Sequence, residues 1–138
     1  ALGREVSVSL DAWAILAWLE DLEQVGAVVE ALVGQRPSVA ELTLAEVEAA
    51  AARHLPREQV GAAIASIAAA CSVVPATDEV WRAAAQCSAE LGLPLTSAVA
   101  LCTARSLGQR LATGDPLLLA VAPPDDVDVL APRAVPYP

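Results

Sequence analysis

The sequence predicts an α/β fold, a three-layer α/β/α sandwich around a small, mostly parallel sheet. Three observations support this prediction. Short apolar runs with strand-like composition alternate with longer segments whose apolar residues recur at helical spacing. Helix-start signals follow several of these runs directly, which is typical of strand–helix units in a parallel sheet. The 138 residues are enough for one domain with a substantial core and too few for two.

In the first half of the chain, helix signals mark most of the boundaries. Gly34 is typical of the residue just past a helix C-terminus, and Pro56 breaks the helical segment before it. Thr43-Leu44-Ala45-Glu46 has the spacing of a capping box, which predicts that a helix begins there. The expected elements are a strand at Val6–Leu10, helices at Ala12–Glu20 and Leu22–Val33, a short strand at Ser38–Leu42, and a helix from Thr43 to about Leu55.

Similar signals organise the second half. Thr77-Asp78 caps a helix that Gly92 closes, and Asp115-Pro116 is typical of an N-cap followed by proline at the first helical position. The expected elements are a helix at Arg57–Ala70, a strand at Cys71–Pro75, helices from Thr77 to Glu90 and from Thr96 to Gly108, and strands at Arg110–Thr113 and Val127–Leu130. We expect residues 1–130 to form one domain and residues 131–138, which include three prolines, to form a tail.

The charge balance restricts the ways in which this chain can bind nucleic acid. Its formal net charge is −9, the wrong sign for a protein that holds nucleic acid by charge alone. Nucleic-acid chemistry would therefore require a bound metal ion or a local arginine patch. The three cysteines lack close pair spacing, so we expect small buried side chains in a reducing compartment rather than disulfides or a zinc site.

One uncharged stretch, Gln59–Thr77, is nearly long enough to span a membrane. It is rich in alanine and contains Gly61 and Pro75, so we interpret it as a buried helix followed by a buried strand. The first residues also lack the pattern of a signal peptide. We therefore expect a cytoplasmic protein without a membrane segment.

Two aspartates follow strand-like runs at opposite ends of the chain. Asp11 comes after Val6–Leu10, and Asp115 comes shortly after Arg110–Thr113. The carboxyl ends of strands in an open parallel sheet face one crevice, where ligands bind, so the two carboxylates can meet there. Paired carboxylates suit a hard divalent cation such as Mg²⁺.

Each candidate acid also has a purely structural interpretation. Asp11 and Asp115 can each cap the helix that follows, accepting backbone N–H groups and interacting favourably with the helix dipole. Glu46 can be the reciprocal half of the capping box with Thr43. The residues alone leave both interpretations open.

Taken in order, the motifs of the chain resemble those of the PIN domain family, in particular its VapC-like toxins. Leu10-Asp11 resembles the family's first strand ending in aspartate, and Thr43–Val47 its glutamate-bearing helix. The later matches are Gly92-Leu93-Pro94-Leu95-Thr96-Ser97-Ala98, Ala104-Arg105-Ser106-Leu107-Gly108 and Thr113-Gly114-Asp115. The resemblance covers about Val6 to Leu130.

This resemblance implies a PIN-like fold and a metal-dependent ribonuclease that acts as the toxin of a toxin–antitoxin pair. Position by position, Asp11, Glu46 and Asp115 match the family's acids, which hold Mg²⁺ or Mn²⁺. RNA is the implied substrate, an antitoxin protein the implied partner, and a homodimer the implied assembly. Two positions depart from the pattern. Ser97 stands where the family usually has a further carboxylate, and Trp13 stands where a small hydroxylated residue is common.

The Ser97 departure and the acidity of the chain motivate an alternative, a PIN-fold module that binds protein or RNA without cleaving it. A third hypothesis, a receiver-like domain with Asp11 as phosphoacceptor, is disfavoured because the chain contains no lysine. Trp13 and Trp18 lie five residues apart on one expected helix and therefore on different faces, which predicts that one of them is exposed.

Overall fold

A sheet of five parallel strands forms the centre of the computed structural model, which describes residues 7–20 and 23–130. The order across the sheet is β3-β2-β1-β4-β5, so the predicted α/β class is confirmed. The strands are β1 (Val8–Leu10), β2 (Ser38–Ala40), β3 (Ser72–Val74), β4 (Arg110–Thr113) and β5 (Val127–Val129).

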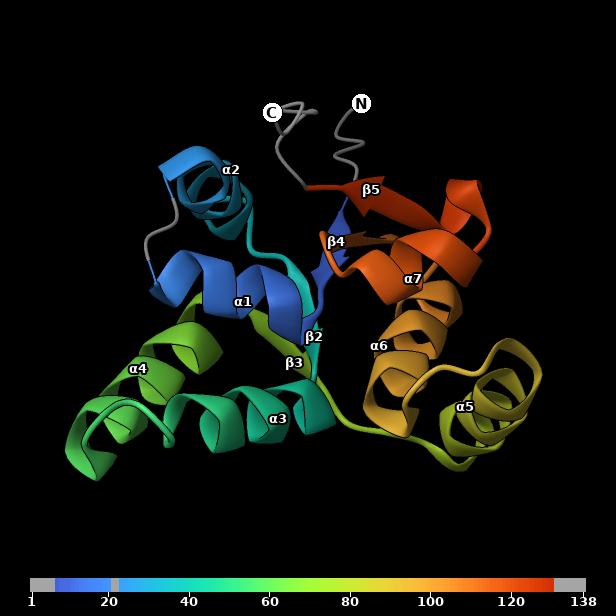
Figure 1. The fold of residues 1–138 in the computed structure, drawn as a ribbon, viewed down its shortest axis with the longest axis horizontal. Coiled ribbons are helices and arrows are strands. Elements are labelled where there is room, and N and C mark those ends of the chain that lie inside the picture. Colours follow the sequence, from blue (N-terminus) through green and yellow to red (C-terminus); the bar gives the residue numbers. More distant parts are fainter. Residues whose placement is uncertain (1–6, 21–22, 131–138) are drawn as a thin grey trace, which may run out of the picture.

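Helices cover both faces of the sheet. They are α1 (Ala12–Leu19), α2 (Glu23–Val33), α3 (Glu41–Ala51), α4 (Arg57–Ala70), α5 (Asp78–Leu91), α6 (Leu95–Ser106) and α7 (Pro116–Val121), with a short 3₁₀ helix η1 (Pro124–Asp126). Figure 1 shows α1 to α4 on one side of the sheet and α5 to α7 on the other. This arrangement is the predicted three-layer sandwich.

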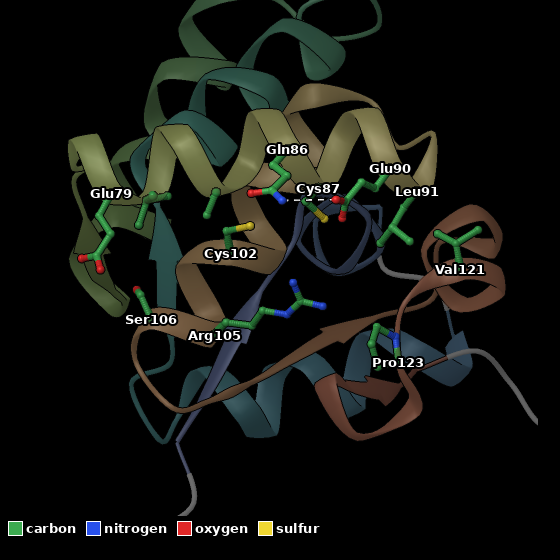
Figure 2. A pocket seen from close by; sticks show the side chains of 12 residues that line it. Glu79, Gln86, Cys87, Glu90, Leu91, Cys102, Arg105, Ser106, Val121 and Pro123 are labelled. Carbon is green, nitrogen blue, oxygen red and sulfur yellow. Dashed lines mark hydrogen bonds between the residues drawn. The ribbon is translucent and has the colours of Figure 1, made fainter.

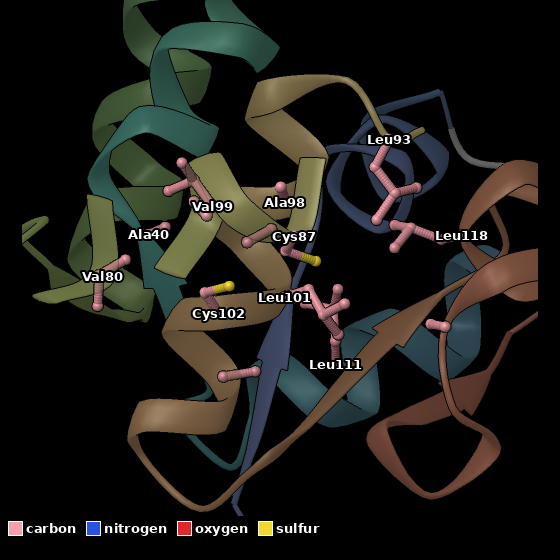
Figure 3. Packing of buried hydrophobic residues seen from close by; sticks show 14 of the residues in the cluster. Ala40, Val80, Cys87, Leu93, Ala98, Val99, Leu101, Cys102, Leu111 and Leu118 are labelled. Carbon is pink, nitrogen blue, oxygen red and sulfur yellow. The ribbon is translucent and has the colours of Figure 1, made fainter. Parts of the chain in front are cut away.

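Successive side chains of β4 pack against the two different helical layers. Leu111 belongs to the buried cluster formed with α5, α6 and α7, whereas Ala112 belongs to the cluster formed with α1 to α4. Successive strand residues point to opposite faces, so each layer receives its own set of side chains. Figure 3 shows Leu111 next to Leu101 of α6 in the first of these clusters.

The strand order places a topological switch point between β1 and β4. From β1 the chain proceeds outward through β2 to β3, and it then returns to the other side of β1 with β4 and β5. Leu10 is in register with Ala112, so Asp11 and Thr113 follow at the same edge of the sheet. The carboxyl ends of strands at such a point line a crevice.

The predicted start of α3 is wrong. The helix begins at Glu41 directly after β2, with Ala40 as an N-cap that makes no side-chain hydrogen bond, and it ends at Ala51 rather than near Leu55. Thr43 therefore lies inside the helix, buried, and its hydroxyl has no partner among the described residues. Because Thr43 is not the N-cap, Glu46 is not part of a capping box, and the purely structural interpretation of Glu46 is wrong.

The prediction of a buried helix and strand over Gln59–Thr77 is only partly correct. The elements are present as α4 and β3, but α4 is amphipathic, with Val60 and Ile67 buried and most other positions at least partly exposed. β3 is an edge strand, so it is hydrogen-bonded to a neighbouring strand, β2, along only one of its two edges. Within residues 7–20 and 23–130, none of the helices combines the length and apolar character needed to cross a bilayer.

The remaining boundaries agree closely with the sequence. α4 and β4 have the predicted limits, and Gly92 closes α5 in the left-handed conformation at φ 71°. The three cysteines are buried and free, as expected. Trp13 and Trp18 are both half-buried, and Trp81 is the exposed tryptophan instead. Val6, Leu22 and residues 131–138 lie outside the described residues.

Candidate acidic site at the carboxyl edge of the sheet

Asp11 lies at the switch point, between the end of β1 and the start of α1. The residue is only 4% exposed. Oδ1 accepts the Ala14 backbone N–H at 2.9 Å, so Asp11 caps α1, and Oδ2 accepts a hydrogen bond from the Thr113 hydroxyl. Asp11 therefore has the capping role that the sequence predicts. The same carboxylate is also hydrogen-bonded to Thr113 at the end of the neighbouring strand β4.

Asp115 lies on the neighbouring segment and begins α7. Its Oδ1 accepts the Leu117 N–H at 3.0 Å, which makes it the N-cap ahead of Pro116. Its own N–H donates to Thr113 Oγ1 at 3.0 Å. A single threonine hydroxyl thus binds the Asp11 carboxylate and the Asp115 backbone. This hydroxyl ties the ends of two adjacent strands together.

The charges of Asp11, Glu46 and Asp115 are coupled. Burial raises the pKa of Asp11 from 3.8 to about 7; hydrogen bonds from Thr113 and Ala14 oppose the increase, and the charges of Asp115 and Glu46 add to it. Burial also raises the pKa of Glu46, with hydrogen bonding to Thr96 opposing the shift and Asp115 adding to it. The structure therefore brings the three predicted residues into one electrostatic neighbourhood.

This neighbourhood contains no compensating basic side chain among the described residues. The ion pairs among the described residues lie elsewhere: Arg105–Asp126 and Arg110–Asp128 connect α6 and β4 to the η1–β5 segment. Like charges held together in a partly buried place are unfavourable unless a cation or a proton neutralises them. The arrangement is thus suited to a positive ligand.

The residues present fit a hydrated divalent cation better than a fully enclosed one. In the described part of the chain, no three acidic, histidine or cysteine side chains converge closely enough to hold a metal ion together. Mg²⁺, however, usually keeps several waters and binds through one or two carboxylates. Asp11 and Asp115 supply such oxygens, and Oδ2 of Asp115 accepts no hydrogen bond from the described residues. The donor set is therefore compatible with a Mg²⁺ or Mn²⁺ ion.

Three structural features of the candidate site were not predicted from the sequence. Thr113 forms the bond between Asp11 and Asp115, and Thr96, the neighbour of Ser97, interacts with Glu46. Ser97 itself is half-buried in the first turn of α6 and makes no side-chain hydrogen bond to the described residues. The position of Thr113 at the end of β4, in register with Asp11, is the signal that could have revealed it.

The third feature is a close contact between Trp13 and Gly114. A Cβ atom at Gly114 would lie 2.3 to 2.7 Å from three carbons of the Trp13 six-membered ring. Such distances are far shorter than any ordinary contact, so only glycine fits beneath this ring. Gly114 does not have a positive φ, and its requirement is therefore one of space rather than of backbone conformation.

A pocket elsewhere in the described residues is separate from the acids. It has a volume of about 610 Å³ and lies between α5, the C-terminal part of α6 and the segment after α7. Figure 2 shows the Arg105 side chain extending into it, with Cys87 and Cys102 along its wall. None of Asp11, Glu46 and Asp115 lines it, so it is not part of the candidate site.

The fold and the site define a parallel α/β protein with an acidic centre at the carboxyl edge of its sheet. The sequence matches the PIN domain family over residues 8–122. The chain therefore belongs to the PIN domain family. A search of curated protein sequences gave no significant match.

Solved structures with the same fold include toxin–antitoxin proteins. A toxin–antitoxin complex from Klebsiella pneumoniae is 16% identical, with a TM-score of 0.72 over 91% of this chain and 98% of the other. A DNA-bound VapBC from Salmonella typhimurium is 17% identical, with a TM-score of 0.72 over 92% and 100%. A VapC toxin from Mycobacterium tuberculosis that cleaves the sarcin–ricin loop is 18% identical, with a TM-score of 0.63 over 83% and 95%. At these identities the likeness establishes the shared fold.

Proposed function

We propose that this protein is a metal-dependent endoribonuclease of the PIN type and the toxin of a toxin–antitoxin pair. The observation that carries the proposal is the coupling of Asp11, Glu46 and Asp115 around a buried carboxylate without a basic partner among the described residues. Carboxylates that act on one another in this way suit a hydrated divalent cation, which binds through one or two of them. Membership of the PIN family and the toxin–antitoxin relatives of the same fold support the reaction class and an antitoxin partner.

The roles of the three acids follow from their surroundings. When bound, Mg²⁺ or Mn²⁺ would supply an activated water and neutralise the charge that develops on a phosphodiester. Asp11 and Asp115 would hold the ion directly, since capping and the hydrogen bonds of Thr113 fix both carboxylates at the same edge of the sheet. Glu46 would orient the water and accept a proton from it, a role that its raised pKa favours.

The wider assignment extends the same proposal. Residues 1–130 form the catalytic domain and 131–138 a tail. The protein acts on RNA in the cytoplasm as a homodimer, and its antitoxin blocks the acidic edge of the sheet. The net charge of −9 means that the bound cation, and not a general positive surface, supplies most of the attraction for phosphate at this site.

The first test is cleavage of a mixed RNA pool by the purified, partner-free chain in Mn²⁺. Asp11→Asn is the control for contaminating nuclease, because it keeps the shape of the side chain and removes its charge. We expect the wild type to cleave and the variant not to. Equal cleavage by both proteins would show that the assignment of Asp11 is wrong.

A second candidate function is supported by Ser97 and by the lack of a closed three-ligand group in the described residues. In this alternative the protein is a PIN-fold module that binds protein or RNA without cleaving it. It predicts that Mn²⁺ barely raises the melting temperature, since a ligand stabilises a protein only in proportion to its binding of the folded state. A large Mn²⁺-dependent increase that Asp115→Asn abolishes would count against it.

A further inference from the structure

The Trp13 side chain connects the two elements that carry the candidate aspartates. Trp13 is the second residue of α1, the helix that Asp11 caps. Its six-membered ring lies directly on Gly114, the residue immediately before Asp115. The ring is half-buried and also packs against the core cluster that contains Leu10 and Ala112. The Trp13 ring therefore contacts the hydrophobic core on one side and the backbone of Gly114, next to Asp115, on another.

The segment under the ring is short and highly constrained. Thr113 is fully buried and binds Asp11 through its hydroxyl, and Asp115 caps α7. Gly114 is the single residue between them, so a shift of its backbone must move the Asp115 carboxylate relative to Asp11. The Thr113 hydroxyl restrains this segment through hydrogen bonds, and the Trp13 ring restrains it through contact.

The contact between the Trp13 ring and Gly114 leaves no space for a side chain at position 114. Because a Cβ at Gly114 would approach three ring carbons to 2.3 to 2.7 Å, even one methyl group requires the ring or the backbone to move. Trp13 is large and has only two rotatable side-chain torsions, so it transmits such a displacement instead of absorbing it. A metal site responds to small displacements of its ligands, since supporting residues typically influence affinity about 10- to 100-fold.

We propose that Trp13 is a positioning residue that, through its contact with Gly114, fixes the Asp115 carboxylate relative to Asp11 for binding of a divalent cation. This inference rests on the proposed metal-dependent function. Under this inference Trp13, which departs from the family pattern, supports the acidic site sterically.

The test is a double-mutant cycle measured as Mn²⁺ affinity by isothermal titration calorimetry, together with thermal unfolding without metal. The variants are Trp13→Leu, Gly114→Ala and both together. Trp18→Leu is the matched control, because Trp18 is also half-buried on α1 and packs against the same core. Leucine retains apolar packing while it removes the ring that reaches Gly114.

We expect Gly114→Ala to weaken Mn²⁺ binding about tenfold or more in the wild-type background and much less in the Trp13→Leu background. Trp13→Leu alone should weaken binding severalfold, whereas Trp18→Leu should lower the melting temperature without changing the affinity. The rescue by the double variant separates positioning from a failure to fold, because a merely destabilised protein would become worse with two substitutions.

The outcomes distinguish this inference from the function on which it rests. A wild type that binds no Mn²⁺ overturns the proposed function and the positioning role together. A wild type that binds Mn²⁺ with Trp13→Leu binding equally well overturns only the positioning role. Tighter binding by Trp13→Leu would also overturn it, since the ring would then obstruct the cation instead of placing its ligand.

Discussion

The hydroxyl of Thr113 donates a hydrogen bond to the carboxylate of Asp11 across 102 positions of sequence. The same oxygen accepts the backbone N–H of Asp115 at 3.0 Å. The two aspartates that end neighbouring strands are therefore linked by one buried group. This link turns two separate helix caps into parts of one site.

Thr113→Val should destabilise the fold, because it removes the hydroxyl and leaves the Asp11 carboxylate and the Asp115 N–H with fewer partners. We expect a loss of about 1–3 kcal/mol in the free energy of unfolding, the usual cost of unpaired buried polar groups. Urea denaturation of Thr113→Val and Thr113→Ser measures it. Thr113→Ser keeps the hydroxyl and should retain most of the stability; an equal loss in both variants would contradict the role of the hydrogen bonds.

Stability without metal should decrease as the pH rises from about 4 to about 7. The folded-state pKa of Asp11, about 7, is above its ordinary value of 3.8, so the folded protein binds more protons than the unfolded chain in this interval. The stabilisation is complete below pH 3.8 and is lost as the pH passes through 7, in total on the order of 4 kcal/mol for this group.

The Asp11→Asn variant separates the contribution of Asp11 to the pH dependence of stability from that of the other carboxylates. The variant cannot ionise at position 11, so its stability should depend less steeply on pH between 4 and 7 than that of the wild type. Denaturant unfolding at intervals of pH in a chelating buffer measures both curves. Identical slopes for the two proteins would show that Asp11 titrates normally.

Mn²⁺ should raise the melting temperature more at pH 8 than at pH 5.5. Cation binding requires ionised carboxylates and therefore competes with the proton that burial favours on Asp11. Thermal unfolding with and without Mn²⁺ at the two pH values tests this, with Asp115→Asn expected to abolish the difference. A shift that is the same at both pH values would place the bound ion elsewhere.

Ser97→Asp should strengthen cation binding. It restores a carboxylate in the first turn of α6, next to Thr96, which interacts with Glu46. We expect about a tenfold or greater gain in Mn²⁺ affinity, since a unit charge near the ion contributes up to about 4 kcal/mol at an effective dielectric near 20. Ser106→Asp, at the far end of α6, is the matched control, and calorimetry would disprove the idea if both variants gained equally.

The elements that position the site were largely predictable because their signals are local. Asp115 before Pro116 identifies a helix start, and Gly92 identifies a helix end, within a few residues of sequence. The start of α3 was not predictable in this way. Ala40 caps the helix without a side-chain bond, whereas the misleading capping-box pattern at Thr43 lies inside it.

The interactions within the site depend on tertiary register and could not be derived from local pattern. The bond between Thr113 and Asp11 exists because β1 and β4 are adjacent and Leu10 is in register with Ala112. The Trp13–Gly114 contact likewise depends on how α1 packs against β4 and the segment that follows it. Sequence could indicate that three acids share one edge, but not which groups hold them there.

The most direct test of the acidic centre is Mn²⁺-dependent RNA cleavage by single acid-to-amide variants at its three positions. Asp11→Asn, Glu46→Gln and Asp115→Asn should each reduce cleavage by about two orders of magnitude or more, because each loses a ligand or the water-orienting group. Glu41→Gln, an exposed position on the same helix as Glu46, should cleave like the wild type. Cleavage that survives all three site substitutions, or that Glu41→Gln impairs equally, would contradict a single catalytic centre formed by these acids.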